Sequence, residues 1–154
     1  MPTVKEDVMF GLLNYGMSSA EAEEKTDSIL SELGILNLKE RHNHRLSGGE
    51  KRMAAIAAVL AMDHTHLLMD EPCSALDPRN RRRIINTLKS LDRAMLIASH
   101  DLDMILDTCS RTVILSDGKI IADGPTSLLL TDKTLLEENN LELPLRYTLS
   151  QEQQ

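Results

Sequence analysis

The stretch Leu67-Leu68-Met69-Asp70-Glu71-Pro72 is the most direct indication of the fold. A short apolar run that ends abruptly in two carboxylates is typical of a buried strand in a sheet flanked by helices. Ligands bind at the carboxyl ends of strands in open α/β sheets. One carboxylate there can hold Mg²⁺, and the other can orient and activate an attacking water. The alternative interpretation is a solvated acidic turn.

The residues around this stretch alternate between helical and extended patterns. Ser18 and Glu21 have the spacing of a capping box, and Gly34 ends the helix that this box begins. The other expected elements are helices over 48–62, from 78 and from 101, a second buried strand over 94–99, a hairpin of strands 111–115 and 119–122, and short helical pieces over 125–140. This alternation predicts an α/β fold, with fraying of residues 151–154.

Length and composition limit the classes of protein that are possible. The chain has 154 residues, 42% hydrophobic and 27% charged, which suffices for one domain with a core. A net charge of -7 and scarce aromatics argue against a nucleic-acid-binding surface. No apolar run is long enough to span a bilayer, and no secretory signal opens the chain. Cys73 and Cys109 have no metal-ligand or redox spacing, so a reduced cytoplasmic setting fits them.

A second motif, Leu46-Ser47-Gly48-Gly49-Glu50, lies at the start of a predicted helix. Two glycines allow a close approach to the backbone, and the free amides and the helix dipole favour an anion there. The alternative is a loop that only caps the helix.

A third motif, Ser99-His100-Asp101, ends the second predicted strand. A histidine at this position can contact a terminal phosphate and help to position water. Taken alone, a single histidine is more often structural. The three residue types also occur in catalytic triads, but sequence neighbours do not make a triad, which needs spatial geometry.

In this order and at these intervals, the motifs LSGGE (46–50), LLMDEP (67–72), SALD (74–77) and SHD (99–101) resemble those of the nucleotide-binding subunit of ABC transporters. The resemblance covers most of the chain. It implies a partial P-loop NTPase fold of the ABC ATPase type, with a mostly parallel sheet flanked by helices and a signature helical subdomain.

The same resemblance suggests three parts and a narrower branch of the family. The parts are a helical signature subdomain (1–47), a core with the Walker B and switch-histidine motifs (48–124) and a helical tail (125–154). The segments 2–8, 117–125 and 141–144 are similar to the cobalt/nickel and energy-coupling-factor branch, which supplies metal ions or vitamins.

Nucleotide contacts are implied for the signature segment. Ser47, Gly48 and Gly49 would contact the γ-phosphate of ATP held by an opposite ABC ATPase subunit, in a homo- or heterodimer. Glu50 stands in the same motif, where Gln is commoner. Asp77 would lie in the loop that couples the two sites across the dimer. A transmembrane transporter subunit is the other implied partner, which would hold the chain at the inner face of the cell membrane.

Catalytic roles are implied for three further residues. Asp70 would be the Walker B acid near Mg²⁺, Glu71 would polarise the hydrolytic water, and His100 would be the switch histidine. ATP and Mg²⁺ are the implied cofactors. Cys73 stands where Thr is commoner in this family, a departure that matters little.

The phosphate-binding loop of the family, which ends in Lys and Ser or Thr between a strand and a helix, is not found. The similar spacing from Gly11 to Ser18 has Met17 in place of the essential Lys, and the charged segment 4–10 precedes it. We therefore expect the chain to be inactive alone. The central sheet would lack a strand and leave an edge with unpaired backbone groups, so we expect marginal stability or association.

Two other patterns suggest ligands less directly. The His-x-His pairs at 42–44 and 64–66 lie in or beside polar connecting segments, and no carboxylate or Cys at ligand spacing completes a metal site. The basic run Arg81-Arg82-Arg83, just after Arg79, is interpreted as a solvated helix face because the chain as a whole is acidic.

Three functions remain open from the sequence. The first is an ABC transporter ATPase subunit present as a truncated or split polypeptide, with ATP hydrolysis driving dimer closure and opening. The second is a non-catalytic interaction module or remnant that supplies its signature helix to a full-length ABC partner. The third is an ABC ATPase of DNA repair or translation, which the acidic charge and the flanking segments disfavour.

Overall fold

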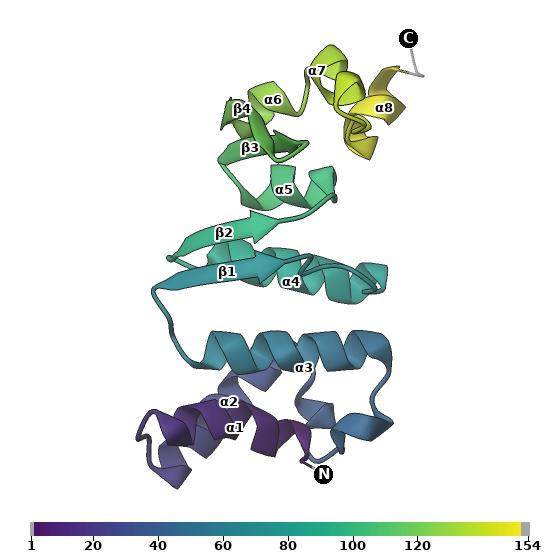
Figure 1. The fold of residues 1–154 in the computed structure, drawn as a ribbon. Helices are drawn as coiled ribbons and strands as arrows, with labels where there is room; N and C mark the ends of the chain where they lie inside the picture. The colour runs from purple at the N-terminus through teal and green to yellow at the C-terminus, as the bar shows by residue number, and fades with distance from the viewer. Residues whose placement is uncertain (1, 152–154) are drawn as a thin grey trace. The chain divides into compact units, whose positions relative to one another are not determined.

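The computed structural model describes residues 2–151, and the chain divides into two compact units, residues 1–96 and 97–154. The first unit contains α1 (Val4–Asn14), α2 (Ser19–Glu32), the 3-10 turns η1 (Leu36–Leu38) and η2 (Asn43–Arg45), α3 (Gly48–Ala61), β1 (His66–Asp70), α4 (Pro78–Ser90) and the first part of β2 (Ala94–Ala98). The second contains α5 (Leu102–Thr108), β3 (Arg111–Ser116), β4 (Lys119–Pro125), α6 (Thr126–Leu129), α7 (Lys133–Glu138) and α8 (Leu145–Gln151) (Figure 1). The predicted α/β fold is confirmed.

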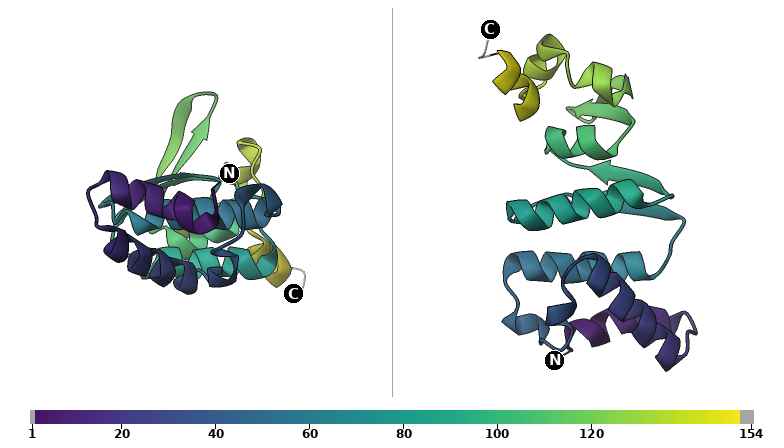
Figure 2. Two further views of the ribbon diagram at one scale, coloured as in Figure 1. Left: turned by 90° about the horizontal axis from the view of Figure 1, so that it is seen from below. Right: turned by 180° about the vertical axis from the view of Figure 1, so that it is seen from behind.

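Helices α1, α2 and α3 each begin with a capping box, a hydroxyl residue followed three positions later by Glu. In α1 the hydroxyl of Thr3 accepts a hydrogen bond from the N–H of Glu6 (3.2 Å), and the Glu6 carboxylate accepts one from the N–H of Thr3 (2.8 Å). These bonds satisfy amides that the first turn of a helix leaves without partners. The three helices pack against one another (Figure 2). Their apolar faces supply a buried core of Val8, Leu12, Leu30, Leu33, Met53, Ala57 and Leu60.

Strands β1 and β2 form a two-stranded parallel sheet, and α4 runs along one of its sides (Figures 1 and 2). The expectation that both strands are buried is wrong. Leu67 is buried, but Leu68 is 78% exposed, and no residue of β2 is buried. Successive side chains of a strand point to opposite faces, so Leu68 faces away from Leu67. Within the described residues α4 covers one side of the sheet, and the other side is open to solvent.

The second unit is built on the predicted hairpin, which is confirmed. Strands β3 and β4 pair antiparallel, with Leu115 opposite Ile120. Asp117 (φ 50°) and Gly118 (φ 71°) connect them in the left-handed conformation, which a two-residue hairpin loop of type I′ requires at both positions. The buried apolar side chains of this unit are Met104, Ile105, Ile114, Leu130 and Leu136.

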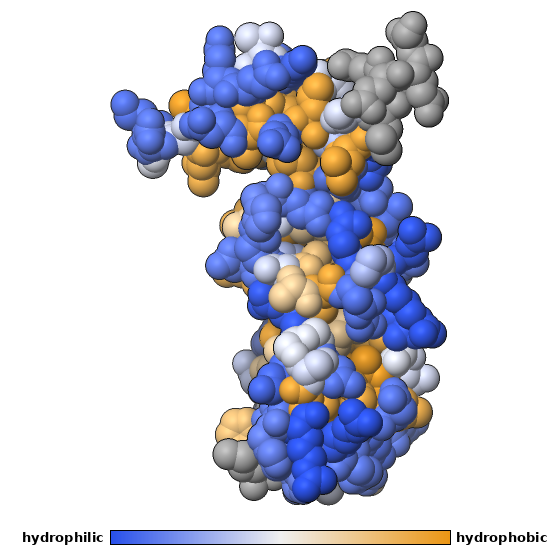
Figure 3. All heavy atoms as spheres, turned by 90° about the vertical axis from the view of Figure 1, so that its right-hand side faces the viewer, coloured by the Kyte–Doolittle hydropathy of each residue, from blue (hydrophilic) through white to orange (hydrophobic). Residues whose placement is uncertain are grey.

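Several large apolar side chains of the second unit are nevertheless exposed: Val113, Leu115, Ile120, Ile121, Leu128 and Leu145. In Figure 3 apolar side chains (orange) gather toward the top of the view, while hydrophilic ones (blue) cover much of the remaining surface. No helix among residues 2–151 is long and apolar enough to cross a membrane. The short helices expected over 125–140 are present as α6 and α7. The expected fraying at the end falls almost wholly outside the described residues.

Candidate functional site

The signature segment forms the N-terminus of α3, as predicted, with Ser47 as its cap. The Ser47 hydroxyl accepts a hydrogen bond from the N–H of Glu50 (3.3 Å), and the Glu50 carboxylate accepts one from the N–H of Ser47 (2.8 Å). A side chain added at Gly48 would meet no atom within 4 Å, so nothing in the described structure crowds the backbone there. The first turn of α3 therefore presents exposed backbone, as anion binding at a helix N-terminus requires.

The charge of Glu50 is partly compensated by its neighbours. Hydrogen bonds from Ser47, the backbone bond foremost, hold the pKa of the Glu50 carboxyl below its usual value, and the Arg41 guanidinium adds to this effect. A guanidinium nitrogen of Arg41 lies 3.5 Å from a Glu50 carboxylate oxygen. A negative side chain thus stands beside the position proposed for a phosphate, and a positive one stands next to it.

The two adjacent carboxylates follow β1 as predicted. Asp70 is the last residue of the strand and is exposed, and Glu71 is half-buried at the start of a tight turn. The turn is closed by a hydrogen bond from the N–H of Ser74 to the carbonyl of Glu71 (3.1 Å). Glu71 has a φ of 48°. A non-glycine residue in this region costs roughly 1–3 kcal/mol, and such residues cluster at functional sites.

Asp77 begins helix α4, and its carboxylate is engaged as the helix cap. It accepts hydrogen bonds from the N–H groups of Arg79 (2.9 Å) and Asn80 (3.0 Å), and a third from the Asn80 side-chain amide (2.7 Å). These bonds, with the Asn80 N–H foremost, lower the pKa of Asp77. Capping is a structural role, and the proposed coupling between two nucleotide sites stays a prediction.

The fold brings the signature helix to the turn that follows Glu71, which sequence reasoning did not foresee. A Cβ atom built on Gly49 would lie 3.7 Å from the carbonyl oxygen of Ala75 and 3.9 Å from the Leu76 side chain. These are ordinary van der Waals distances for an added Cβ, so the turn lies near the signature helix and leaves room for a small side chain at Gly49. Ala75 also has a positive φ of 60°. The only sequence signal for this proximity was the glycine itself.

His100 lies in the second unit, two residues before the start of α5, and is exposed. The hydroxyl of Ser99 accepts a hydrogen bond from the N–H of Asp101 (3.1 Å), and the Asp101 carboxylate accepts one from the N–H of Met104 (3.0 Å). The histidine is therefore flanked on both sides by residues that are tied to the start of α5. Asp70, Glu71 and Asp77 share one turn region in the first unit.

The donor set for a cofactor is incomplete within the described residues. No group of three or more His, Cys, Asp or Glu among them could hold a metal ion. Asp70 alone is compatible with Mg²⁺, because this ion uses one or two carboxylates together with water and substrate phosphates. A phosphate loop is not found in residues 2–151. The Gly11 to Ser18 segment, with the required Lys replaced by Met17, spans the end of α1 and the turn into α2.

The less direct sequence patterns have structural roles. The rings of His42 and His44 stack 5.6 Å apart, and His64 meets Tyr15 edge to face at 5.9 Å. The predicted solvated face of the arginine run is wrong in part, because Arg82 is exposed but Arg81 and Arg83 are half-buried. Arg83 is half-buried and donates a hydrogen bond to the carbonyl of Gly34 (3.2 Å), because the left-handed glycine that ends α2 turns its carbonyl toward α4.

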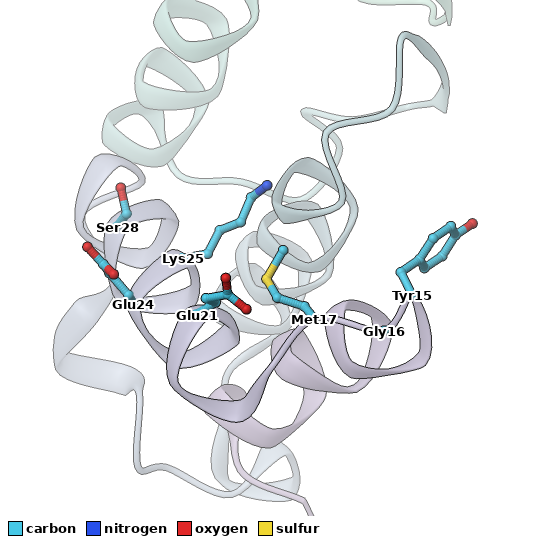
Figure 4. Close-up of a pocket in the computed structure, with 7 residues that line it drawn as sticks. All are labelled: Tyr15, Gly16, Met17, Glu21, Glu24, Lys25 and Ser28. Atoms are coloured by element: carbon cyan, nitrogen blue, oxygen red, sulfur yellow. The ribbon is translucent and has the colours of Figure 1, made fainter.

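A pocket of about 600 Å³ lies at the corner between α1 and α2 (Figure 4). Its lining residues are Tyr15, Gly16, Met17, Glu21, Glu24, Lys25 and Ser28. None of the residues predicted to act on nucleotide lines it. Lys25 forms an ion pair with Asp63, and Glu21 belongs to the capping box of α2.

Comparison with solved structures defines the class of protein. The cbiO1 protein of Clostridium perfringens, described as part of the ABC transporter complex cbiONQ, is 33% identical with a TM-score of 0.73, over 97% of this chain and 61% of that one. A metal-chelate type ABC transporter in an inward-facing conformation has a TM-score of 0.79 at 22% identity, over 90% of this chain and 58% of that one, which supports the fold alone. The fold is therefore that of an ABC ATPase domain, a P-loop nucleotide hydrolase.

Sequence comparison points to the same class of protein. Residues 2–74 match the family model described as ABC transporter. An ABC transporter ATP-binding protein of Gloeobacter violaceus is 47% identical over 94% of this chain and 60% of its own length. Over most of its length the chain is therefore similar to ABC transporter ATP-binding proteins. It spans about 60% of the length of this relative and of the cbiO1 protein.

Proposed function

We propose that this chain supplies the signature helix, the Walker B carboxylates and the switch histidine of an ATP-hydrolysing ABC transporter subunit. In this proposal it hydrolyses ATP only when a polypeptide with a phosphate-binding loop completes it. The main support is the proximity of the signature helix at Gly49 to the turn that follows Asp70 and Glu71. In a dimer with shared sites, this proximity would couple the segment that binds the partner's nucleotide to the carboxylates that act on the nucleotide of this chain's own subunit.

In this proposal Asp70, Glu71 and His100 have separate roles around the γ-phosphate. Asp70 would hold Mg²⁺, directly or through water, and the ion would supply positive charge that offsets the negative charge of the phosphates. Glu71 orients the attacking water and accepts its hydrogen bond, and its half-buried position in a fixed turn limits the directions available to the carboxylate. His100 contacts the phosphate that leaves.

The signature helix acts on the nucleotide of the opposite subunit. The Ser47 hydroxyl accepts the N–H of Glu50, which leaves its own proton to donate to a phosphate oxygen. The amides of exposed Gly48 and half-buried Gly49 would add donors at the positive end of the helix dipole. Asp77 caps the start of α4, and in this proposal the loop that contains it couples the two nucleotide sites.

The partners in this proposal are a second ABC ATPase subunit, identical or different, and a transmembrane transporter subunit. The transport process is uptake of cobalt, nickel or a vitamin. Its support is the likeness of the flanking segments to that branch, together with the cbiO1 protein, which is described as part of a cbiONQ complex. The chain would then act in the cytoplasm at the inner face of the membrane.

The test is phosphate release by the purified chain, with and without a separately produced polypeptide that carries the phosphate-loop half of a close relative. We expect no ATPase activity above background from the chain alone, and activity from the mixture. Robust Glu71-dependent hydrolysis by the chain alone would contradict the need for completion. A mixture that binds ATP and the chain but never hydrolyses would contradict the catalytic role.

The second candidate is a non-catalytic module that offers its signature helix to a full-length ABC partner. The observation in its favour is that residues 2–151 contain no phosphate loop beside well-formed α3. Mixing the chain with a full-length ABC subunit separates the two candidates. If the chain is a non-catalytic module, changing Ser47 abolishes its effect on the ATPase rate of the partner. Glu71→Gln then leaves that effect intact, because Glu71 has no catalytic role in a module of this kind.

A further inference from the structure

Arg146 near the end of the chain joins α8 to α5. Its Nε lies 2.9 Å from a carboxylate oxygen of Asp103 and one terminal nitrogen lies 3.0 Å from a carboxylate oxygen of Asp107. The same side chain donates to the backbone carbonyl of Asp103 (3.1 Å). The other carboxylate oxygen of Asp103 accepts the N–H of Leu145 (2.8 Å). One aspartate therefore anchors both the side chain of Arg146 and the first backbone amide of α8.

We call these bonds of Arg146 to Asp103 and Asp107 the clasp. The clasp offsets the repulsion between two like charges in α5. Asp103 and Asp107 are four positions apart, and like charges at this spacing destabilise a helix. Their side chains are only 20% and 34% exposed, so water screens the repulsion incompletely. Arg146 neutralises both carboxylates and bonds in a fixed planar geometry that Lys cannot reproduce.

Helix α5 needs such support because it is short. It has 7 residues, and isolated helices of this length are not stable in water. Its buried residues Met104 and Ile105 fix one side of the helix. The Asp101 cap holds its beginning, and Arg146 holds the side that carries Asp103 and Asp107.

The start of α5 is also what orients the histidine. The hydroxyl of Ser99 accepts the N–H of Asp101, and the carboxylate of Asp101 accepts the N–H of Met104. His100 lies between these two bonded residues. Any tilt or fraying of the first turn of α5 is therefore transmitted to His100 within three residues, and all of these groups belong to the second unit.

We propose that Arg146 is a positioning residue for His100, which acts by clasping α5 through Asp103 and Asp107. The inference rests on the proposed function for its catalytic meaning, because His100 has a task only if the completed subunit hydrolyses ATP. The structural part of the inference, that Arg146 stabilises α5 and so the position of His100, does not depend on that function. The C-terminal segment then contributes to hydrolysis indirectly, through α5 and His100, without contacting the nucleotide.

The first experiment is hydrogen–deuterium exchange on the full chain, followed by mass spectrometry. Arg146→Ala should speed exchange in peptides that cover residues 99–108 by about 3-fold or more, because the opening of α5 becomes more frequent. Arg146→Lys should restore part of the protection. Arg111→Ala is the matched control, since Arg111 forms a comparable two-bond ion pair with Asp123 on the hairpin (2.8 and 2.7 Å). Equal exchange over 99–108 in wild type and Arg146→Ala would overturn the proposal.

The second experiment measures ATP hydrolysis by the completed subunit. Arg146→Ala should lower kcat by about 5-fold or more while KM for ATP stays within about 2-fold, because nucleotide binding does not use His100 alone. Asp103→Asn should act in the same direction, and Arg111→Ala should leave both constants unchanged. Equal kcat for wild type and Arg146→Ala would overturn the positioning role. Absence of hydrolysis in the wild-type mixture contradicts the proposed function instead, and the exchange experiment still tests the clasp.

Discussion

Glu71 combines a carboxylate, partial burial and a backbone conformation that non-glycine residues avoid. Glycine would adopt a φ of 48° without strain, yet the position holds a side chain that can accept a proton or a hydrogen bond. The strained backbone at the end of β1 is consistent with a position at which the direction of the carboxylate matters more than the stability of the fold.

In the completed subunit, Glu71→Gln should lower the rate of phosphate release by about 100-fold or more, because loss of a positioned general base typically costs this much. ATP binding should persist, since Gln keeps the size and one acceptor oxygen of Glu. Filter binding checks that ATP binding persists, and phosphate release from the same preparation checks the loss of turnover. Glu137→Gln, a surface change in α7, is the control. Undiminished turnover would remove Glu71 from the role of base.

Ser47 and Ser18 offer a matched pair, since both cap a helix in the same way. Replacing either by Ala should cost about 1 kcal/mol of unfolding free energy, as expected for a lost N-cap. Only Ser47→Ala should also weaken ATP-dependent association with a partner ABC subunit. Thermal melts and sedimentation of the two variants check this. Equal association of both variants would reduce Ser47 to a helix cap.

Among the elements, the three N-terminal helices each begin with a capping box. The stability that these capping boxes contribute depends on pH. The side-chain bond to Ser18 and then its backbone bond lower the pKa of Glu21 below 4.5. Analogous bonds from Thr3 and Ser47 lower the pKa of Glu6 and Glu50. A carboxyl whose pKa is lower in the folded state stabilises that state above its unfolded pKa. The contribution is lost as pH falls through the folded pKa.

The melting temperature of the chain should therefore fall as pH drops from about 4.5 downward. Glu21→Gln should reduce the steepness of this fall, because Gln keeps the capping box without a titrating group. The control is Glu24→Gln, which lies on the same helix outside the cap. Melts followed by circular dichroism between pH 7 and 3 test the prediction, and identical slopes for Glu21→Gln and wild type would contradict it.

At the level of the whole chain, the open face of the β1–β2 sheet is the feature that needs a partner. Strands of parallel sheets are normally covered on both faces, and an uncovered strand edge promotes pairing with other chains. Leu68 at 78% exposure belongs to such a face.

The isolated chain should accordingly self-associate or melt at a temperature that depends on its concentration. Leu68→Ser should reduce association, because it removes apolar surface from the open face. Phe10→Ser is the control, since Phe10 is similarly exposed (69%) but lies on a helix without an unpaired strand edge. Analytical ultracentrifugation over a range of concentrations is the measurement. A cooperative melt of a monomer, independent of concentration, would count against this view.

Much of the architecture was readable from the amino-acid order because its signals are local. Capping boxes act over three residues, the hairpin turn at Asp117 and Gly118 needs only its own residue types, and Asp70–Glu71 follow a short apolar run. The motif spacing also carried the resemblance to ABC ATP-binding proteins. The Gly11 to Ser18 segment could be told from a phosphate loop at the same level, since Met17 stands at the position of the required Lys.

Only the tertiary structure decided three features: the proximity of Gly49 to the Ala75 turn, the half-buried position of Arg83 at Gly34, and the ion pairs of Arg146 with Asp103 and Asp107. Each joins residues far apart in the sequence, where no periodicity or spacing rule applies. The exposure of Leu68 was misjudged for the same reason: an apolar strand pattern states which side chains prefer burial, and burial itself depends on which other segments are present to cover them.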